Sequence, residues 1–227
     1  METATQAEKQ PQSHGGHDYK SVFLKAILAG MMIAIGASAY LGIENHYIGA
    51  ALFTIGLFSI YTLDFYLYTG KVGYLLEDKD ILKIVIIWIG NFVGVVTIAF
   101  LVLQTRMTET TSIVENAIHY AEVKLGDSSY VSLFVLGIFC GIMMFLAAVS
   151  FKSTQNTHNS VGGYIGLFLC VMIFMLLGFE HSIANMFYFT IAAAWSGHAV
   201  VAILVVTLGN AVGGLLINVI SLGIAKH

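Results

Sequence analysis

Long apolar segments constrain this chain more than any other feature of its sequence. Four stretches with at most one charged side chain each cover residues 22–41, 81–103, 131–151 and 198–222. A helix needs about 20 mostly apolar residues to cross the hydrocarbon core of a bilayer. Because hydrophobic residues make up 58% of the chain and charged residues only 10%, a soluble fold would lack the polar surface it needs. We therefore predict an all-α protein that spans a membrane.

Two further apolar stretches are long but interrupted by polar residues. One covers residues 47–76 and contains Asp64, and the other covers residues 161–195 and contains Glu180 and His181. With them the chain has six predicted spans, of which the second and the fifth are broken. Unpaired backbone groups are not tolerated against lipid, so each break is expected to line a cavity inside the protein.

The order of whole and broken spans suggests two related halves. The motif GN-x-VG begins at Gly90 in span three and again at Gly209 in span six, and a weaker match links Gly30 of span one with Gly141 of span four. Halves with an odd number of spans must lie in opposite orientations, as in the inverted repeats of many transport proteins. We predict a polar cytoplasmic tail over residues 1–20 and a membrane domain over residues 21–227. Within that domain, the first repeat covers about residues 22–103 and the second about residues 131–222.

The repeated motif predicts close contacts between helices. In lipid, helices associate through small residues that let their backbones approach, and the two glycines of each motif are four residues apart, on one helix face. The asparagine between them is expected to hydrogen-bond across the contact. Six residues are therefore assigned to helix packing rather than to a ligand: Gly90, Asn91, Gly94, Gly209, Asn210 and Gly213.

The distribution of basic residues predicts the orientation of the chain. Cytoplasmic connections of membrane proteins carry an excess of Lys and Arg. If both termini lie inside, the cytoplasmic side holds Lys9, Lys20, Lys25, Lys79, Lys83, Lys152 and Lys226. The opposite side keeps Arg106 and Lys124, and Lys71 sits at the first break. We expect a multi-pass protein of the cytoplasmic (inner) membrane, surrounded by lipid, with both termini in the cytoplasm.

The two breaks carry the residues that can meet a permeating solute. Half-helix ends that converge near the midplane favour an anion, because helix N-termini carry partial positive charge. At the first break, Thr69 offers a hydroxyl, either to the anion or as a cap for the second half-helix. At the second, a neutral His181 can donate from one ring nitrogen. Glu180 and Asp64 are expected to bind backbone groups that the breaks leave free.

Other function classes find little support in the sequence. The histidines are scattered, and the chain has no HExxH, no paired cysteines, no GxSxG and no phosphate-binding glycine loop. We therefore expect no enzyme activity, no metal and no cofactor. The formal charge of −3 argues neither for nor against nucleic acid, and we expect no such partner.

Two non-enzymatic alternatives are also weighed. A channel for neutral solutes of the aquaporin kind is disfavoured, because no Asn-Pro-Ala repeat occurs and Pro11 is the sole proline. A non-conducting membrane protein that keeps the fold is the other alternative. A purely structural bundle, however, has no need for converging half-helices.

The residues around the breaks resemble those of the formate/nitrite transporter family. The resemblance rests on Leu67-Tyr68-Thr69-Gly70, on residues 178–187 (GFEHSIANMF) and on both GN-x-VG motifs, and it spans about residues 22–222. It implies a homopentamer with an aquaporin-like fold and one pore in each protomer.

The resemblance also implies roles for individual residues. The central constriction and selectivity residues are then Leu67, Thr69 and His181. The apolar constriction on the cytoplasmic side is formed by Phe53, Leu57 and Phe174. Lys124 matches the vestibule lysine of the family. Independently of the resemblance, Asn185 is expected to support the second loop beside Glu180. Two positions beside the pore depart from the family pattern, since Tyr66 stands where an acidic residue is common and Lys71 where asparagine or threonine is common.

The expected function is a channel or transporter for small monovalent anions, with formate favoured by the family and nitrite or hydrosulfide as alternatives. We expect Lys124 to draw an anion into the outer vestibule and Thr69 with His181 to replace part of its hydration, while apolar rings exclude hydrated cations. The substrate crosses either as the anion or as the neutral acid, with His181 as the proton partner. Protonating a carboxylate at pH 7 costs roughly 4 kcal/mol, comparable to the several kcal/mol of desolvating an ion, so both routes stay open.

Overall fold

The computed structural model describes residues 18–154 and 161–224, which form helices and connecting turns with no strand among them. Four helices in this part of the chain are long and apolar enough to cross a membrane: α1 (Tyr19–Gly42), α5 (Ile81–Leu103), α8 (Tyr130–Thr154) and α11 (Gly197–Ile224). They coincide with the four uninterrupted apolar stretches. Most of the predicted tail, including Lys9, lies outside the described residues, as does Lys226.

Shorter helices account for the two interrupted stretches. Helix α2 (His46–Thr62) is followed, after a turn at residues 63–67, by the consecutive short helices α3 (Tyr68–Lys71), η1 (Val72–Tyr74) and α4 (Leu75–Asp78). Helix α9 (Val161–Leu176) is followed, after a turn at residues 177–181, by α10 (Ser182–Ile191). We call these the first turn and the second turn. The connection from α5 to α8 contains α6 (Met107–Thr110), α7 (Ile113–Glu122) and the π-helical segment η2 (Val123–Asp127).

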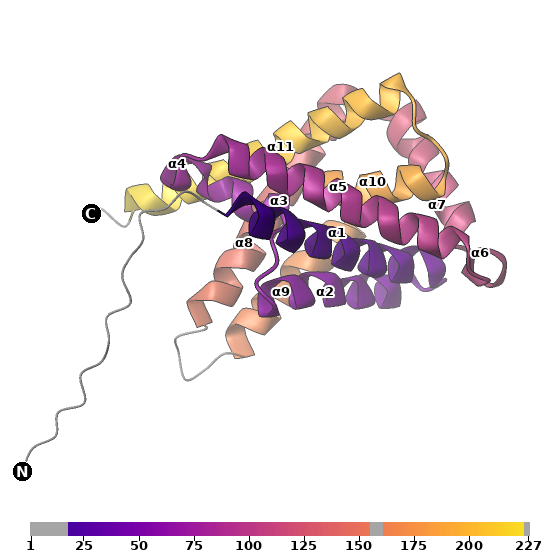
Figure 1. Ribbon diagram of the computed structural model, residues 1–227, viewed down its shortest axis with the longest axis horizontal. Helices are drawn as coiled ribbons and strands as arrows, with labels where there is room; N and C mark the ends of the chain where they lie inside the picture. Colours follow the sequence, from indigo (N-terminus) through magenta and orange to yellow (C-terminus); the bar gives the residue numbers. More distant parts are fainter. Residues whose placement is uncertain (1–17, 155–160, 225–227) are drawn as a thin grey trace, which may run out of the picture.

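The helices form two similar groups that meet along α2 and α9. Helix α1 packs against α5 and α2, and α8 packs against α11 and α9. The segments after the turns cross to the other group, since α10 packs on α5 while α3 packs on α8 and η1 on α11. The start of α1 and the end of α11 lie at one end of the molecule, and α6 and α7 lie at the other (Figure 1).

Glycines set the distance within the main helix pairs. A Cβ on Gly94 would collide with the backbone of Ile27 in α1, and a Cβ on Gly213 would collide with the backbone of Ile138 in α8. Two further glycines touch the backbone of the partner helix in the same way: Gly30 and Gly141. The helices thus approach as closely as backbone atoms allow, which is how apolar helices gain packing energy where no hydrophobic effect drives them together.

Candidate functional site

The two turns bring two buried polar side chains into contact. Thr69, at the start of α3, and His181, at the end of the second turn, are both buried, and Thr69 Oγ1 lies 3.1 Å from His181 Nε2. Thr69 does not cap its helix, because Leu67 is the N-cap residue of α3 and forms no side-chain cap bond. Of the two roles considered for this hydroxyl, the structure therefore rules out the capping role.

The orientation of the His181 ring follows from its other nitrogen. The backbone N–H of Ala184 donates to His181 Nδ1 at 3.2 Å, which makes His181 the N-cap of α10. Because a backbone N–H can only donate, Nδ1 is unprotonated, and a neutral ring must carry its proton on Nε2. His181 thus directs one N–H toward Thr69 and the space beside it.

Asn91 of α5 holds the first turn in place. Its side-chain oxygen accepts from the backbone N–H of Tyr68 at 2.9 Å, and its amide nitrogen donates to the backbone oxygens of Tyr66 at 2.9 Å and Ala26 at 2.8 Å. One buried amide therefore binds both sides of the turn and fastens them to α1.

Asn210 of α11 makes the same three contacts at the second turn. Its side-chain oxygen accepts from the N–H of Ser182 at 3.0 Å, and its amide nitrogen donates to the backbone oxygens of Glu180 at 2.8 Å and Gly137 of α8 at 2.9 Å. The two GN-x-VG motifs thus satisfy backbone groups that a turn at membrane depth would leave without a partner.

The acidic residues of the turns have a different role from the one expected. Asp64 accepts from Lys25 Nζ at 2.5 Å, and its side chain is 67% exposed. The carboxylate of Glu180 accepts from Lys124 Nζ at 2.7 Å through both oxygens and from the amide of Asn185 at 2.6 Å. These carboxylates were expected to bind loop backbone, but their recorded partners are side chains. The side chains of Asn91 and Asn210 bind backbone groups of the turns instead.

The Lys124–Glu180 ion pair lies beside a small cavity. Its side chains are 9% and 5% exposed, and Lys124 Nζ lies 5.9 Å from the ring centroid of Tyr188. The cavity has a volume of about 30 Å³ and is lined by Lys124, His181, Asn185, Tyr40, Tyr120 and Tyr188, among others. Because a water needs about 10–15 Å³, the space suits one small solute between the lysine and the central histidine.

Apolar side chains also lie against His181, and one of them, Phe174, lines the same cavity. The ring of Phe174 lies 5.8 Å from His181 and 5.6 Å, edge-on, from Phe53 between ring centroids. Phe53 and Leu57 are four residues apart on one face of α2, and both are fully buried. Leu67 is buried beside Thr69. The ring contacts thus connect Phe53, Phe174 and His181, three of the residues that the resemblance assigned to the two constrictions.

Three tyrosines around the cavity are site residues that the sequence did not reveal. Tyr40 and Tyr120 share a hydrogen bond of 2.8 Å between their hydroxyls, and Tyr120 stacks on Tyr188 with ring centroids 5.7 Å apart. They come from α1, α7 and α10. No motif links them, because the contacts join positions far apart in the chain and tyrosine is common at membrane interfaces.

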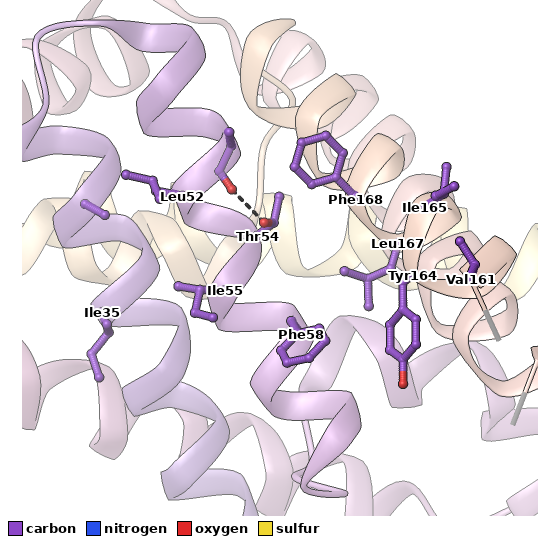
Figure 2. Close-up of a pocket in the computed structure, with 12 residues that line it drawn as sticks. Ile35, Leu52, Thr54, Ile55, Phe58, Val161, Tyr164, Ile165, Leu167 and Phe168 are labelled. Carbon is purple, nitrogen blue, oxygen red and sulfur yellow. Dashed lines mark hydrogen bonds between the residues drawn. The ribbon is translucent and has the colours of Figure 1, made fainter.

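A large hollow on the outer surface is not part of this site. It lies between α2 and α9 and has a volume of about 680 Å³. Figure 2 shows that its wall consists of apolar side chains such as Leu52, Phe58 and Phe168, while Thr54 donates to the Ala51 carbonyl at 2.6 Å. No charged side chain lines the hollow, so it offers nothing that would hold an ion.

Comparison with known proteins gives a consistent result. The model of the formate/nitrite transporter family matches residues 1–223. The formate channel FocB of Escherichia coli is 26% identical over 193 residues, which cover 77% of this chain and 67% of that protein. The nitrite transporter NirC of Salmonella typhimurium is 31% identical over 140 residues, which cover 56% and 48%. A solved structure, a pentameric formate channel with formate bound, aligns with a TM-score of 0.75 at 22% identity, covering 92% of this chain and 97% of that one.

Proposed function

Because the chain belongs to the formate/nitrite transporter family, whose members are membrane transporters and channels rather than enzymes, we propose that it conducts small monovalent anions, with formate as its substrate. The observation that carries this proposal is the contact between Thr69 and His181, which presents a hydroxyl and a ring N–H at a buried centre. Formate is favoured over nitrite because the match to FocB covers more of both chains than the match to NirC. Nitrite and hydrosulfide are the alternatives.

We further propose the complete architecture expected from the sequence. The membrane domain consists of six spans in two inverted repeats, with the two turns as the breaks of spans two and five. The matching contacts of Asn91 and Asn210 support this arrangement, because unrelated segments have no reason to share three equivalent hydrogen bonds. A homopentamer with one pore in each protomer is supported by the pentameric relative. We place the protein in the cytoplasmic membrane with both termini inside.

In the proposed path, an anion first meets Lys124. A lysine ammonium has three N–H donors, and the two oxygens of Glu180 use two of them. Within the described residues the third has no recorded acceptor, so it can donate to an anion in the cavity, while the ion pair keeps the buried charge compensated. The anion next exchanges water for the hydroxyl of Thr69 and the N–H of His181. It then passes the apolar rings of Phe174 and Phe53.

The cap on Nδ1 favours His181 as a hydrogen-bond donor to the anion. If His181 took up a proton, Nδ1 would become a donor facing the N–H of Ala184, and the start of α10 would lose its cap. Transport of the neutral acid through His181 would therefore require that bond to open in each cycle. We propose that the ring stays neutral while the anion passes.

Flux into proteoliposomes that contain the purified protein tests the proposal. Formate, nitrite, hydrosulfide and chloride are compared at two pH values, with His181→Asn as the variant. Selective flux of formate, reduced in the variant, is the expected result. If the variant still conducts formate but its flux no longer depends on pH, His181 is instead the residue that exchanges a proton with the substrate. No flux of any of the four anions through folded protein would contradict the proposed function.

A further inference from the structure

Three tyrosines from three different helices line the small cavity that Lys124 also lines. Tyr40 lies in the last turn of α1, Tyr120 in α7 and Tyr188 in α10. Tyr40 and Tyr188 are buried, whereas Tyr120 is partly exposed, and α7 lies at the end of the molecule opposite the start of α1 (Figure 1). The three side chains, which we call the tyrosine cluster, therefore extend from the cavity to the surface.

The rings of the tyrosine cluster hold one another in place. The ring centroids of Tyr40 and Tyr120 lie 5.8 Å apart, and those of Tyr120 and Tyr188 lie 5.7 Å apart. Lys124 Nζ lies 5.9 Å from the ring centroid of Tyr188, so the stack ends beside the ammonium group. Because a rotation of Tyr120 would break its contacts with both neighbours, the hydroxyls are kept in a defined arrangement.

The hydroxyl protons of the cluster outnumber the acceptors that the protein gives them. Tyr40 Oη and Tyr120 Oη lie 2.8 Å apart and share one hydrogen bond, in which either can donate. Each phenol has one proton, so this bond uses one proton and leaves the other without an acceptor among the described residues. The hydroxyl of Tyr188 has no partner in the same part of the chain. Two O–H donors are thus left for a solute in the cavity.

These donors suit an anion that carries oxygen atoms. Lys124 gives two of its three N–H groups to Glu180, so the remaining N–H and the two hydroxyl protons make three donors. A carboxylate has two oxygens with about four lone-pair sites, and hydrogen bonds from a hydroxyl to a charged oxygen are among the strong ones. Sulfur is a weak acceptor. Hydrosulfide therefore gains much less from the same hydroxyls.

We propose that Tyr40, Tyr120 and Tyr188 are specificity-determining residues, whose hydroxyls donate to the oxygens of a small oxyanion held at Lys124. The inference rests on the proposed function and narrows its substrate class to oxyanions such as formate, against hydrosulfide. The bond between Tyr40 and Tyr120 fixes the pair, and the oxyanion accepts from the proton that this bond does not use.

The test measures current across planar bilayers that contain the purified protein, against the concentration of formate or of hydrosulfide. A mildly alkaline pH keeps both solutes mostly anionic, and current counts only the charged form, so neutral acid that crosses the lipid does not contribute. The double variant Tyr40→Phe/Tyr120→Phe keeps both rings and removes both hydroxyl protons. Its half-saturating formate concentration is expected to rise about three- to tenfold, and that of hydrosulfide by less than about twofold.

The single variants distinguish this role from a structural one. Tyr40→Phe and Tyr120→Phe each break the same hydroxyl bond as the double variant, but each leaves one phenol whose proton can go to the solute. Both are therefore expected to shift the formate value clearly less than the double variant does. A bond that only supports the fold is already lost in either single variant. Equal shifts in the single and double variants, or equal shifts for formate and hydrosulfide, overturn the proposal.

Tyr188→Phe gives an independent measurement, because it removes a hydroxyl that makes no hydrogen bond to the described residues. The half-saturating formate concentration is expected to rise about three- to tenfold here too. If the double variant fails to fold, as judged by circular dichroism and gel filtration, wild-type behaviour of Tyr188→Phe still overturns the proposal. The control is Tyr19→Phe, which loses a hydroxyl bond to Asp80 at the opposite end of the molecule and should match the wild-type protein.

The same currents separate this inference from the proposed function. No current for any small anion through folded wild-type protein contradicts the proposed function. Wild-type current with the same half-saturating formate concentration in every tyrosine variant leaves that function standing and removes only the role of the tyrosine cluster.

Discussion

At the residue scale, the polar side chains of the site each make one contact that holds the fold and leave another atom available to a solute. His181 uses Nδ1 to cap α10 and keeps Nε2 for the space beside Thr69. Lys124 gives most of its hydrogen bonds to Glu180. In both cases one side of a functional group is fixed by the protein, so that the other side is presented in a defined direction at little entropic cost. Substitutions can therefore remove the contact with the solute and the structural contact of each residue separately.

The cap and the pore contact of His181 can be separated by choosing the replacement. Asparagine is a good N-cap residue but cannot extend a ring N–H toward Thr69, whereas alanine loses both interactions. We expect His181→Ala to cost about 0.5–2 kcal/mol more stability than His181→Asn, while both variants lose most formate flux. Thermal unfolding in detergent and flux in proteoliposomes measure the two effects. Equal stability of the two variants would show that the cap contributes nothing.

The buried ion pair is expected to be far more sensitive than the exposed one. Glu180→Gln leaves the ammonium of Lys124 buried without a counter-charge, which should lower the free energy of unfolding by about 3–5 kcal/mol. The matched control is Asp64→Asn, whose pair with Lys25 is exposed and should matter by less than about 1 kcal/mol. Unfolding in detergent measures both single variants. The double variant Lys124→Met/Glu180→Gln should recover much of the free energy of unfolding that Glu180→Gln loses. Similar costs for the two single variants would contradict this explanation.

At the element scale, the sequence predicted the four long helices well and the contacts between elements poorly. Apolar length alone locates α1, α5, α8 and α11, because lipid requires it. The GN-x-VG repeat identified Asn91 and Asn210 as residues between helices. It could not show that their amides bind the turns, since those bonds depend on how α3 and α10 cross to the other helix group. For the same reason the partner of Glu180 could not be foreseen.

The two asparagines offer a test at this scale. Asn91→Ala removes the bond to the N–H of Tyr68 and two bonds to backbone oxygens, one of them a carbonyl within α1, and Asn210→Ala removes the equivalent three bonds at the second turn. At about 1–3 kcal/mol for each unsatisfied group, both should destabilise the protein by several kcal/mol, and by similar amounts. Asn116→Ala, which loses one bond of 2.8 Å to Leu41, is the control. Thermal unfolding ranks them, and a large difference between the first two would argue against equivalent halves.

At the scale of the whole molecule, charge distinguishes the two ends of a path that is otherwise built symmetrically. The helix groups, glycine contacts and asparagine bonds occur twice. The lysines do not, because Lys124 pairs with a buried carboxylate, whereas Lys71 and Lys152 at the other end form no ion pair within the described residues. The fold alone therefore leaves the direction of the chain in the membrane undetermined, and the basic residues decide it.

This orientation leads to a prediction about the intact chain. Lys79 and Arg106 are exposed in the connections before and after α5, so they should lie on opposite sides of the membrane. After alanine replaces Cys140 and Cys170, a membrane-impermeant maleimide should label Arg106→Cys in intact cells. It should label Lys79→Cys only after permeabilisation, because the side that carries the excess of lysine and arginine is expected to face the cytoplasm. The reverse pattern would mean that the lysine-rich end of the molecule faces outward and that the orientation expected from the basic residues is wrong.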